Sequence, residues 1–542
     1  MPSRPSPLWL LVLAAACTGP STPRPGDTAG PGTNPETPVD TLFSTPLPCT
    51  DGGLRDPGFF ETIPLALPPP SVQNLWAAAA AVGDVDGDGR LDVLALSEDG
   101  AILFRNPDWS PEPLLPVDRP ASLALVDTDG DGDLDLFIGV YGGRDRLFEN
   151  DGGGGFIDIS PTALPGDLPA NSMSVSFADV DSDGDLDGLV LTTGEVVDDI
   201  NIPVRHFPPS APARLWINRG DGRFDDRGDR LPTALHAGFT LAGGLHDLDR
   251  DGAMDLYAVN DFGATHGSNL WLRGDGAGGF AIAEGAHGLG ITTTGMGLGL
   301  GDVNGDGFDD LTLAYWGGVR VLESVASAEP AWFDTTALRL PDPFGTAAVA
   351  WGGELADLDN DGQLDLYMSF GHIAFGERFD NPAAQQDRLY LGVPGEGPWV
   401  EATAQWGLDN AGVTRGTVLA DLDGDGWLDL VRPSQDGAAL LLSRCEAPRG
   451  VRVQLHQEGP NPNAIGARVE LLTTAGSQTR TVRAGGTNFG SSGPPEAHFG
   501  FGDASSGSLR ITWPDGGASQ FDALIGGQLV QIERASAPLA SD

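Results

Sequence analysis

Apolar residues recur along this chain in short runs that either alternate with polar residues or stay continuous, as in Leu91–Leu96 and Leu134–Ile138. Alternation with a period of two is the pattern of a half-buried β-strand, and a short continuous run between turn residues is consistent with a fully buried one. The 78 glycines and 43 prolines supply many turns between such strands. The pattern therefore predicts an all-β protein.

Seven of these strand-like segments are interrupted by one nine-residue phrase, Asp-x-Asp/Asn-x-Asp-Gly-x-x-Asp. Oxygen side chains at positions 1, 3, 5 and 9, with one backbone carbonyl from position 7, nearly fill the shell of six to eight oxygens that Ca²⁺ prefers. We therefore expect up to seven calcium ions. Their predicted side-chain ligands are Asp84, Asp86, Asp88 and Asp92; Asp127, Asp129, Asp131 and Asp135; Asp179, Asp181, Asp183 and Asp187; Asp247, Asp249, Asp251 and Asp255; Asp302, Asn304, Asp306 and Asp310; Asp357, Asp359, Asp361 and Asp365; and Asp421, Asp423, Asp425 and Asp429.

The other columns of the phrase support this interpretation. Position 6 is Gly in every copy, as expected where the backbone turns through a positive φ. Position 7 has no shared side-chain chemistry, which fits a ligand donated by the backbone. Asn304 replaces one Asp and Asp309 replaces an apolar residue, so the fifth loop should deviate most and still bind.

Two other interpretations of the phrase are an acidic solvated turn and an EF-hand or dockerin loop. Empty carboxylates about 4 Å apart would repel by roughly 1–4 kcal/mol per pair, and seven recurrences of four fixed columns argue against a simple turn. An EF-hand needs a helix on each side and an acid at position 12. Here the flanking segments have the pattern of strands.

The loops divide the chain into units of four strands: one of small residues before the loop, a Leu/Val/Ile strand after it, a third strand and a strand with an aromatic residue. Repeated four-stranded units are typical of propeller blades. We predict a seven-bladed β-propeller over residues 46–447, followed by a small C-terminal β domain. The last unit lacks its own fourth strand, and Gly58–Thr62 has that signature, so it is expected to complete the last blade and close the ring.

The N-terminus resembles a bacterial lipoprotein signal peptide. Residues 1–16 hold a short apolar run that ends in Leu13-Ala14-Ala15-Ala16, and Cys17 follows as the lipid-bearing residue. Residues 17–45 are rich in Pro, Gly and Thr, the composition of a tether. Resemblance to sorted lipoproteins suggests the outer membrane or cell surface of a bacterium. An ordinary secretory signal with a chance cysteine is the alternative.

Two cysteines remain, Cys49 before the predicted closing strand and Cys445 after the last third strand. Both should lie at the seam of the ring, where a disulfide would suit an oxidising compartment. Two unpaired thiols are the alternative.

The formal charge of −47 argues against nucleic acid as a partner, because non-specific binding needs clustered basic residues. Seven Ca²⁺ would reduce that charge to −33, since 7 × 2 = 14. Contact with a membrane is expected only through the N-terminal lipid.

The loops and the phrases Asn218–Phe224, Val259–Phe262 and Gly295–Asp302 resemble the FG-GAP/VCBS repeats of integrin-like propellers. Residues 448–535 resemble the ASPIC/UnbV domain found in relatives of cartilage acidic protein, and 536–542 form a tail. The matching phrases of that domain are Ala464–Val469, Val482–Gly486, His498–Gly502, Ile511–Gly516 and Gly527–Leu529. The resemblance implies the architecture and no settled chemistry.

Two functions remain. The favoured one is a calcium-stabilised cell-surface scaffold that binds protein or glycan, without enzymatic activity. The alternative is a secreted carbohydrate-active enzyme, because similar propellers serve as polysaccharide lyases that use Ca²⁺ with a basic side chain. His206, His266 and His372 lie in long connections where such a site could form, but the basic residues are all Arg and no local catalytic motif is present.

Overall fold

The computed structural model describes residues 39–47, 60–67, 76–166, 169–194, 212–285, 287–340, 344, 347–372, 384–408, 411–435, 437–443 and 449–535. Asp40–Ser536 form one compact unit. The signal peptide, Cys17, Cys49, Cys445, His206 and the tail lie outside the described residues, so the lipid, the disulfide and that histidine stay predictions. Within the described residues, no helix has the length and apolar character needed to cross a membrane.

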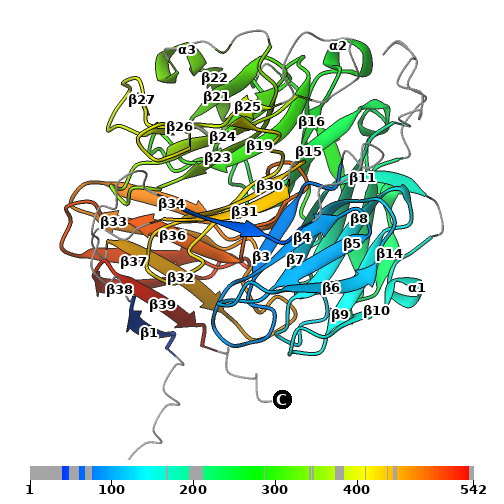
Figure 1. The fold of residues 1–542 in the computed structure, drawn as a ribbon, viewed down its shortest axis with the longest axis horizontal. Helices are drawn as coiled ribbons and strands as arrows, with labels where there is room; N and C mark the ends of the chain where they lie inside the picture. The colour runs from blue at the N-terminus through cyan, green and yellow to red at the C-terminus, as the bar shows by residue number, and fades with distance from the viewer. Residues whose placement is uncertain are drawn as a thin grey trace, which may run out of the picture. The chain divides into compact units, whose positions relative to one another are not determined.

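The described residues form seven four-stranded antiparallel blades, each with its innermost strand first (Figure 1). Blade 1 is β3 (Ala80–Gly83), β4 (Asp92–Ser97), β5 (Gly100–Phe104) and β6 (Pro111–Pro116); blade 2 is β7 (Pro120–Val126), β8 (Asp135–Gly143), β9 (Arg146–Asn150) and β10 (Phe156–Asp158); blade 3 is β11 (Ala170–Ala178), β12 (Asp187–Thr192), β13 (Arg214–Asn218) and β14 (Phe224–Asp226); blade 4 is β15 (Thr240–His246), β16 (Asp255–Asn260), β17 (Leu270–Gly274) and β18 (Phe280–Ile282).

Blade 5 is β19 (Gly295–Gly301), β20 (Asp310–Tyr315), β21 (Gly318–Val325) and β22 (Ala331–Asp334); blade 6 is β23 (Ala350–Ala356), β24 (Asp365–Phe370), β26 (Arg388–Leu391) and β27 (Val400–Glu401); blade 7 is β29 (Val418–Ala420), β30 (Asp429–Ser434), β31 (Gly437–Leu442) and β2 (Glu61–Leu65). Short elements in the connections are α1 (Ser160–Ala163), α2 (Gly263–His266), α3 (Thr336–Arg339), β25 (Gln385–Gln386) and β28 (Ala411–Gly412). The all-β propeller is therefore confirmed.

An N-terminal strand closes the ring, as predicted. β2 pairs antiparallel with β31, with Glu61 opposite Leu442 and Leu65 opposite Ala438. The strand begins three residues later than the aromatic signature suggested, because Phe60 instead packs in the core between blades 6 and 7. Another apolar cluster joins blade 7 to blade 1, so the seam is packed like the other blade interfaces.

The predicted crowding of the innermost strands is confirmed by their glycines. A Cβ added at Gly299 of β19 would lie 1.8 Å from the Gly353 carbonyl oxygen of β23. A side chain at this position would collide with the next blade, so the small residues reflect close packing around the centre of the ring.

The C-terminal domain contains two further four-stranded sheets. The first has the order β1 (Thr41–Pro46), β39 (Gln528–Glu533), β32 (Gly450–His456) and β36 (Glu496–Gly500); the second has the order β34 (Ser477–Thr481), β33 (Arg468–Thr473), β37 (Gly507–Thr512) and β38 (Ala518–Leu524). β1 lies beside β39 (Figure 1). The stretch predicted as a tether up to residue 45 therefore ends earlier, because Thr41–Pro46 pairs with the last strand of the chain.

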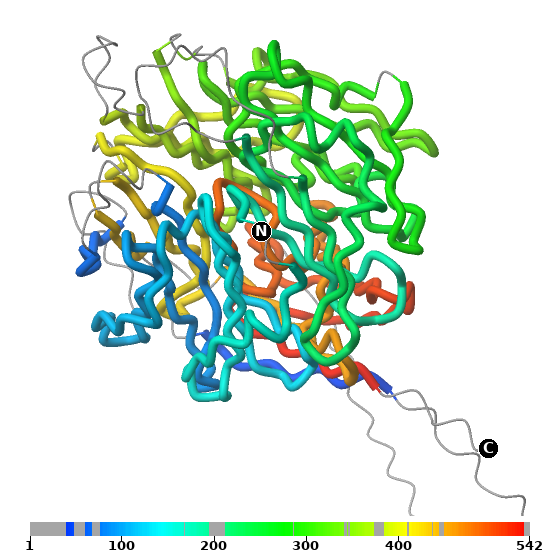
Figure 2. Tube along the Cα trace, turned by 90° about the vertical axis from the view of Figure 1, so that its right-hand side faces the viewer, coloured from blue at the N-terminus to red at the C-terminus, as the bar shows by residue number. Residues whose placement is uncertain are grey.

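Residues 483–492 of the C-terminal domain run through the centre of the ring, and we call them the plug. β35 (Ala484–Gly485) pairs with β11 of blade 3. In Figure 2 the orange trace of this part of the chain lies between blue, green and yellow strands. The sequence predicted a domain packed on the propeller, and the structure places part of it inside the ring.

The plug contacts an innermost strand, or the residue beside one, in every blade. Its hydrogen bonds to blades 1, 2, 4, 5 and 7 are Ala80 N to Ser491 Oγ (3.0 Å), Leu123 N to Gly490 O (2.9 Å), His246 Nε2 to Gly486 O (3.1 Å), Asn488 N to Leu298 O (2.6 Å) and Asn488 Nδ2 to Thr417 O. Phe489 is fully buried and meets the Trp351 ring of blade 6 edge-on at 4.9 Å. With the strand pairing to blade 3, the plug acts as a central axle for the ring.

Candidate metal centre in seven acidic loops

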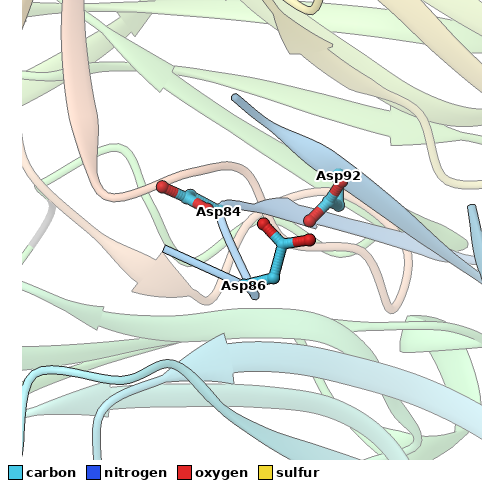
Figure 3. A group of neighbouring side chains, drawn as sticks. All are labelled: Asp84, Asp86 and Asp92. Atoms are coloured by element: carbon cyan, nitrogen blue, oxygen red, sulfur yellow. The ribbon is translucent and has the colours of Figure 1, made fainter. Parts of the chain in front are cut away.

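The seven acidic loops occupy equivalent places, each connecting the innermost strand of a blade to its second strand. All 28 predicted ligand residues lie in the described part of the chain. Figure 3 shows the loop of blade 1, in which the carboxylates of Asp86 and Asp92 approach one another beside Asp84. Ligand atoms of this triad, and of one triad in each of loops 2, 3, 4 and 6, lie within 4.8 Å of one another.

Two hydrogen bonds repeat in every loop and fix its shape. The carboxylate at position 1 accepts the backbone N–H of the glycine at position 6, at 2.8–3.2 Å, and the side-chain oxygen at position 5 accepts the N–H of position 7, at 2.7–3.0 Å. The glycine at position 6 has a positive φ in all seven loops, between 85° and 99°. The predicted reason for that glycine is confirmed.

The aspartate at position 9 joins the loop to the rest of its blade. In blade 2, Asp135 Oδ2 accepts the N–H of Thr128 at 3.0 Å, and Oδ1 accepts the N–H of Asn150 at 3.0 Å, where β9 ends. The same pair of bonds, from position 2 and from the end of the third strand, recurs in all seven blades. This residue therefore supports the loop and offers its remaining lone pairs to a metal.

Burial makes the ionised form of these carboxylates unfavourable in the metal-free protein. It raises the pKa of Asp187 to about 8 and that of Asp135 and Asp255 to about 7, and neighbouring loop carboxylates raise each pKa further. The pKa of Asp357 rises to about 8 for the same two reasons, although Arg480 opposes the rise. A bound cation would stabilise the charged forms.

Unpaired oxygens indicate that the loops fit a cation. Asp86, Asp181, Asp247, Asp302 and Asp357 each have a buried Oδ1 atom without a hydrogen-bond partner among the described residues. A buried carboxylate oxygen is costly when unpaired, because it has lost its water. A hard cation is the ligand that such convergent oxygens take.

The loops differ in their neighbours. Arginines lie beside the position 3 carboxylates of loops 1, 3 and 4: Arg105 Nη1 is 2.8 Å from Asp86 Oδ2, Arg230 Nη1 is 3.7 Å from Asp181 Oδ2, and Arg273 Nε is 3.0 Å from Asp249 Oδ2. These ion pairs offset part of the negative charge. They also hold the position 3 side chains in place.

Loops 5, 6 and 7 lie against the C-terminal domain. Arg483 pairs with Asp309 of loop 5, and the N–H of Gly500 donates to Asp357 Oδ2 of loop 6 at 2.9 Å. Arg452 Nη1 lies 3.7 Å from Asp421 Oδ2 of loop 7. The C-terminal domain therefore contacts both the centre of the ring and three of the acidic loops.

Sequence reasoning missed a second left-handed residue in each loop. Position 4 has a positive φ in all seven copies: Gly87, Gly130, Ser182, Arg250, Gly305, Asn360 and Gly424. Four of these residues are Gly, which was the available signal. The other three each reach the neighbouring blade: Ser182 Oγ donates to Gly276 O at 3.1 Å, Asn360 Nδ2 donates to Gly426 O at 3.0 Å, and the Arg250 guanidinium lies over the Phe308 ring.

The asparagines that end three of the third strands were also not recognised as linkers. Asn150 Nδ2 donates to Val85 O of loop 1, and Asn218 Nδ2 donates to Thr128 O of loop 2, at 3.0 and 2.8 Å. Asn106 makes the corresponding bond to Leu422 O of loop 7. Each asparagine therefore connects its blade to the preceding loop, and the Asn106 bond crosses the seam of the ring.

Two of the histidines considered for an enzymatic site lie among aromatic side chains. The His266 ring is 5.8 Å from Phe239 and 6.5 Å from Phe262, and the His372 ring meets Trp316 edge-on at 5.1 Å. Burial lowers the pKa of His266. These residues lie near the starts of innermost strands or the ends of second strands, and so on the face of the ring opposite the acidic loops.

Comparison with known proteins agrees with this architecture. Residues 84–138, 127–190 and 247–313 match the model of the FG-GAP-like repeat, and residues 457–539 match that of ASPIC and UnbV. The chain contains FG-GAP-like repeats and a C-terminal ASPIC/UnbV domain. The matched repeats cover acidic loops of blades 1–5, and the sheet order identifies blades 6 and 7 as the same kind of unit.

The curated relatives are cartilage acidic protein 1 from Homo sapiens, 28% identical over 273 residues, and from Xenopus tropicalis, 27% identical over 274 residues. Each match covers 49% of this chain, and 39% and 40% of the relatives. The chain thus spans about two fifths of the length of the curated relatives it matches. Among solved structures, a lectin from Burkholderia pseudomallei aligns with a TM-score of 0.40 and 12% identity over 67% of this chain and 94% of the lectin.

Proposed function

We propose that this chain is a calcium-stabilised lipoprotein of the bacterial cell envelope that acts as a binding scaffold for protein or glycan. Its propeller would supply a rigid surface, its acidic loops would hold Ca²⁺, and its N-terminal lipid would attach it to the outer membrane. The observation that carries the proposal is the set of buried, unpaired carboxylate oxygens in a closed ring of repeated loops.

The calcium part of the proposal is supported by the local chemistry. Position 1, 3, 5 and 9 side chains and the position 7 carbonyl would hold each ion, as the sequence predicted. When bound, Ca²⁺ would offset the repulsion among the loop carboxylates. The hydrogen bonds already present at positions 1, 5 and 9 would orient those carboxylates before an ion arrives.

The plug limits where a ligand could bind. Because residues 483–492 occupy the centre of the ring and contact all seven blades, a ligand site inside the central channel conflicts with this structure. Recognition of a partner is then expected on the outer surface. The face with Trp316 and His372, and the side where loops meet the C-terminal domain, are the two regions to test.

Binding can be tested with the full-length chain on glycan and protein arrays, with calcium and after chelation. The proposal expects a reproducible ligand whose binding weakens when calcium is removed. A protein that binds no glycan or protein partner in either condition would contradict it.

The lipid attachment has its own test. We expect labelled palmitate to enter the wild-type chain, and the Cys17→Ala variant to remain unlabelled. Labelling that persists in the variant would rule out Cys17 as the lipid-bearing residue.

The enzymatic alternative predicts turnover. Incubation with a panel of polysaccharides, followed by detection of new reducing or unsaturated ends, would reveal it. Turnover that is lost in His266→Ala or His372→Ala would replace the scaffold proposal.

A further inference from the structure

A cleft of about 800 Å³ opens where blades 5 and 6 meet the C-terminal domain. Its walls come from loop 5, from the turn at Pro394–Glu396 in blade 6 and from the hairpin between β33 and β34. This volume lies within the range of pockets that bind small molecules. All of its lining residues belong to the described part of the chain.

The walls of this cleft are held in place by buried hydrogen bonds. Arg339 is 1% exposed, and its Nη2 atom donates to Glu323 Oε2 at 3.0 Å. Its Nη1 atom donates to the carbonyl oxygens of Gly395 and Gly397 at 2.6 and 3.2 Å. One arginine therefore ties the turn of blade 6 to blade 5, so the cleft is formed before any ligand binds.

Loop 5 presents an incompletely satisfied oxygen site to the cleft. Asp302 is only 8% exposed and lines the cleft, yet its Oδ1 atom has no hydrogen-bond partner among the described residues. Asn304 carries no charge, and its Nδ2 atom donates to Ser324 O at 2.9 Å. Asp306 Oδ2 accepts the N–H of Ala326 at 2.9 Å. This loop thus offers fewer charged and unengaged oxygens than its six counterparts, so a cation here would need oxygens from another molecule.

The outer wall of the cleft is apolar. Phe333 of β22 and Val325 of β21 line it and are 58% and 52% exposed. Aromatic and aliphatic surface beside a few polar groups is the usual composition of a site for a neutral organic ligand.

The charge of the cleft disfavours an anion. Asp302, Asp306, Asp361 and Glu396 contribute carboxylates to the walls, and the guanidinium of Arg339 is already paired with Glu323. One divalent cation would leave the walls negative, and like charges repel an acidic ligand. Neutral hydroxyl oxygens can ligate Ca²⁺ without that penalty.

We propose that this cleft binds a neutral glycan, with loop 5 presenting its cation to sugar hydroxyl groups and Phe333 packing against a sugar ring. The proposal rests on the proposed function as a binding scaffold, and it specifies both the site and the chemical class of the ligand. The face opposite the acidic loops is the competing location.

The test uses the full-length chain and four soluble neutral polysaccharides as probes: a mannan, a xylan, a β-glucan and a galactan. Binding is measured in calcium for the wild type and for Phe333→Ala, Ile157→Ala and Trp316→Ala, with the melting temperature of each variant checked first. Ile157 is the matched control, because it occupies the corresponding position on the outermost strand of blade 2, is 61% exposed and lies outside the cleft. Trp316 reports on the opposite face.

We expect at least one probe to bind in calcium, to bind about tenfold more weakly to Phe333→Ala and to bind Ile157→Ala and Trp316→Ala as it binds the wild type. Chelation should weaken binding, and Asp302→Asn should do so while the other six loops keep their ions.

Three results would overturn the cleft proposal: no binding of any neutral probe, equal binding by Phe333→Ala and the wild type, or a loss confined to Trp316→Ala. The last two would leave the scaffold function standing and move its site elsewhere. A protein ligand found on the arrays, with no glycan bound, would do the same.

Discussion

At the scale of single residues, the acidic loops are built from a few positions with separate tasks. Glycine at position 6 turns the backbone, and position 9 joins the loop to the end of the third strand. The columns at positions 1, 3, 5, 6 and 9 could be predicted from the sequence, because seven copies repeat the same residue types. Position 4 could not, since Ser182, Arg250 and Asn360 hide the left-handed conformation that Gly marks in the other copies.

The backbone conformation of position 6 gives a direct prediction. Gly252 has φ +93°, and a Cβ added there meets nothing within 4 Å, so Gly252→Ala tests backbone strain alone. We expect it to lower the free energy of unfolding by about 1–3 kcal/mol. Gly290→Ala is the control, because its added Cβ also meets nothing and its φ lies outside the left-handed region. Equal denaturation midpoints for the two variants would contradict this account.

The loop carboxylates predict an unusual pH dependence for the metal-free protein. Their folded-state pKa values, about 7 for Asp135 and Asp255 and about 8 for Asp187, lie above the ordinary value, so the folded state binds more protons than the unfolded state between those limits. The free energy of unfolding should therefore fall as the pH rises through this window.

Calcium should remove that fall, because the ion replaces the proton. Melting temperatures of metal-free and calcium-loaded protein, measured from about pH 5 to about pH 8, check the prediction. A metal-free melting temperature that rises steadily across this range would be incompatible with buried, mutually repelling carboxylates.

At the scale of elements, neighbouring blades are joined by side-chain hydrogen bonds as well as by apolar packing. The sequence predicted the strand that completes blade 7, because the aromatic fourth-strand signature was left over at the N-terminus. It did not predict β6, in which prolines replace the aromatic residue, or β1, whose partner β39 is almost 500 residues away. Short strands whose pairing is decided by distant residues leave little local signal.

Asn106 provides a test of the seam between blades 1 and 7. Its Nδ2 atom donates to Leu91 O at 3.1 Å and to Leu422 O, so Asn106→Ala leaves both carbonyls without this donor. We expect a loss of about 1–3 kcal/mol in the free energy of unfolding by denaturant. Asp108→Ala, at an exposed position in the same turn, should have little effect. A neutral Asn106→Ala variant would mean that the seam does not depend on this bond.

At the scale of the whole molecule, the plug makes the propeller and the C-terminal domain one structural unit. The sequence of residues 483–492 has no strand periodicity, and its contacts are with seven separate blades, so no local pattern could have revealed it. The domain itself was predicted because Val451–His456 and Leu509–Trp513 have the apolar pattern of strands and lie among phrases of the ASPIC/UnbV domain. Topology within the ring needed the structure.

The plug predicts a single cooperative unfolding transition for Asp40–Ser536. Phe489→Ala removes a fully buried ring at the centre and should lower stability by about 3–5 kcal/mol without splitting that transition. Phe43→Ala, at a ring that is 55% exposed on β1, is the control and should change little. Calorimetry measures both, and two separate transitions in the wild type would show that the plug does not couple the domains.

The central claim is that the seven acidic loops are calcium sites that stabilise the closed ring. Its most direct test is the number of calcium ions that the purified chain retains after dialysis against calcium, counted by native mass spectrometry, together with the melting temperature before and after chelation. The account predicts seven ions per chain and a lower melting temperature once they are removed. A chain that retains no calcium, with a melting curve that chelation leaves unchanged, would contradict it.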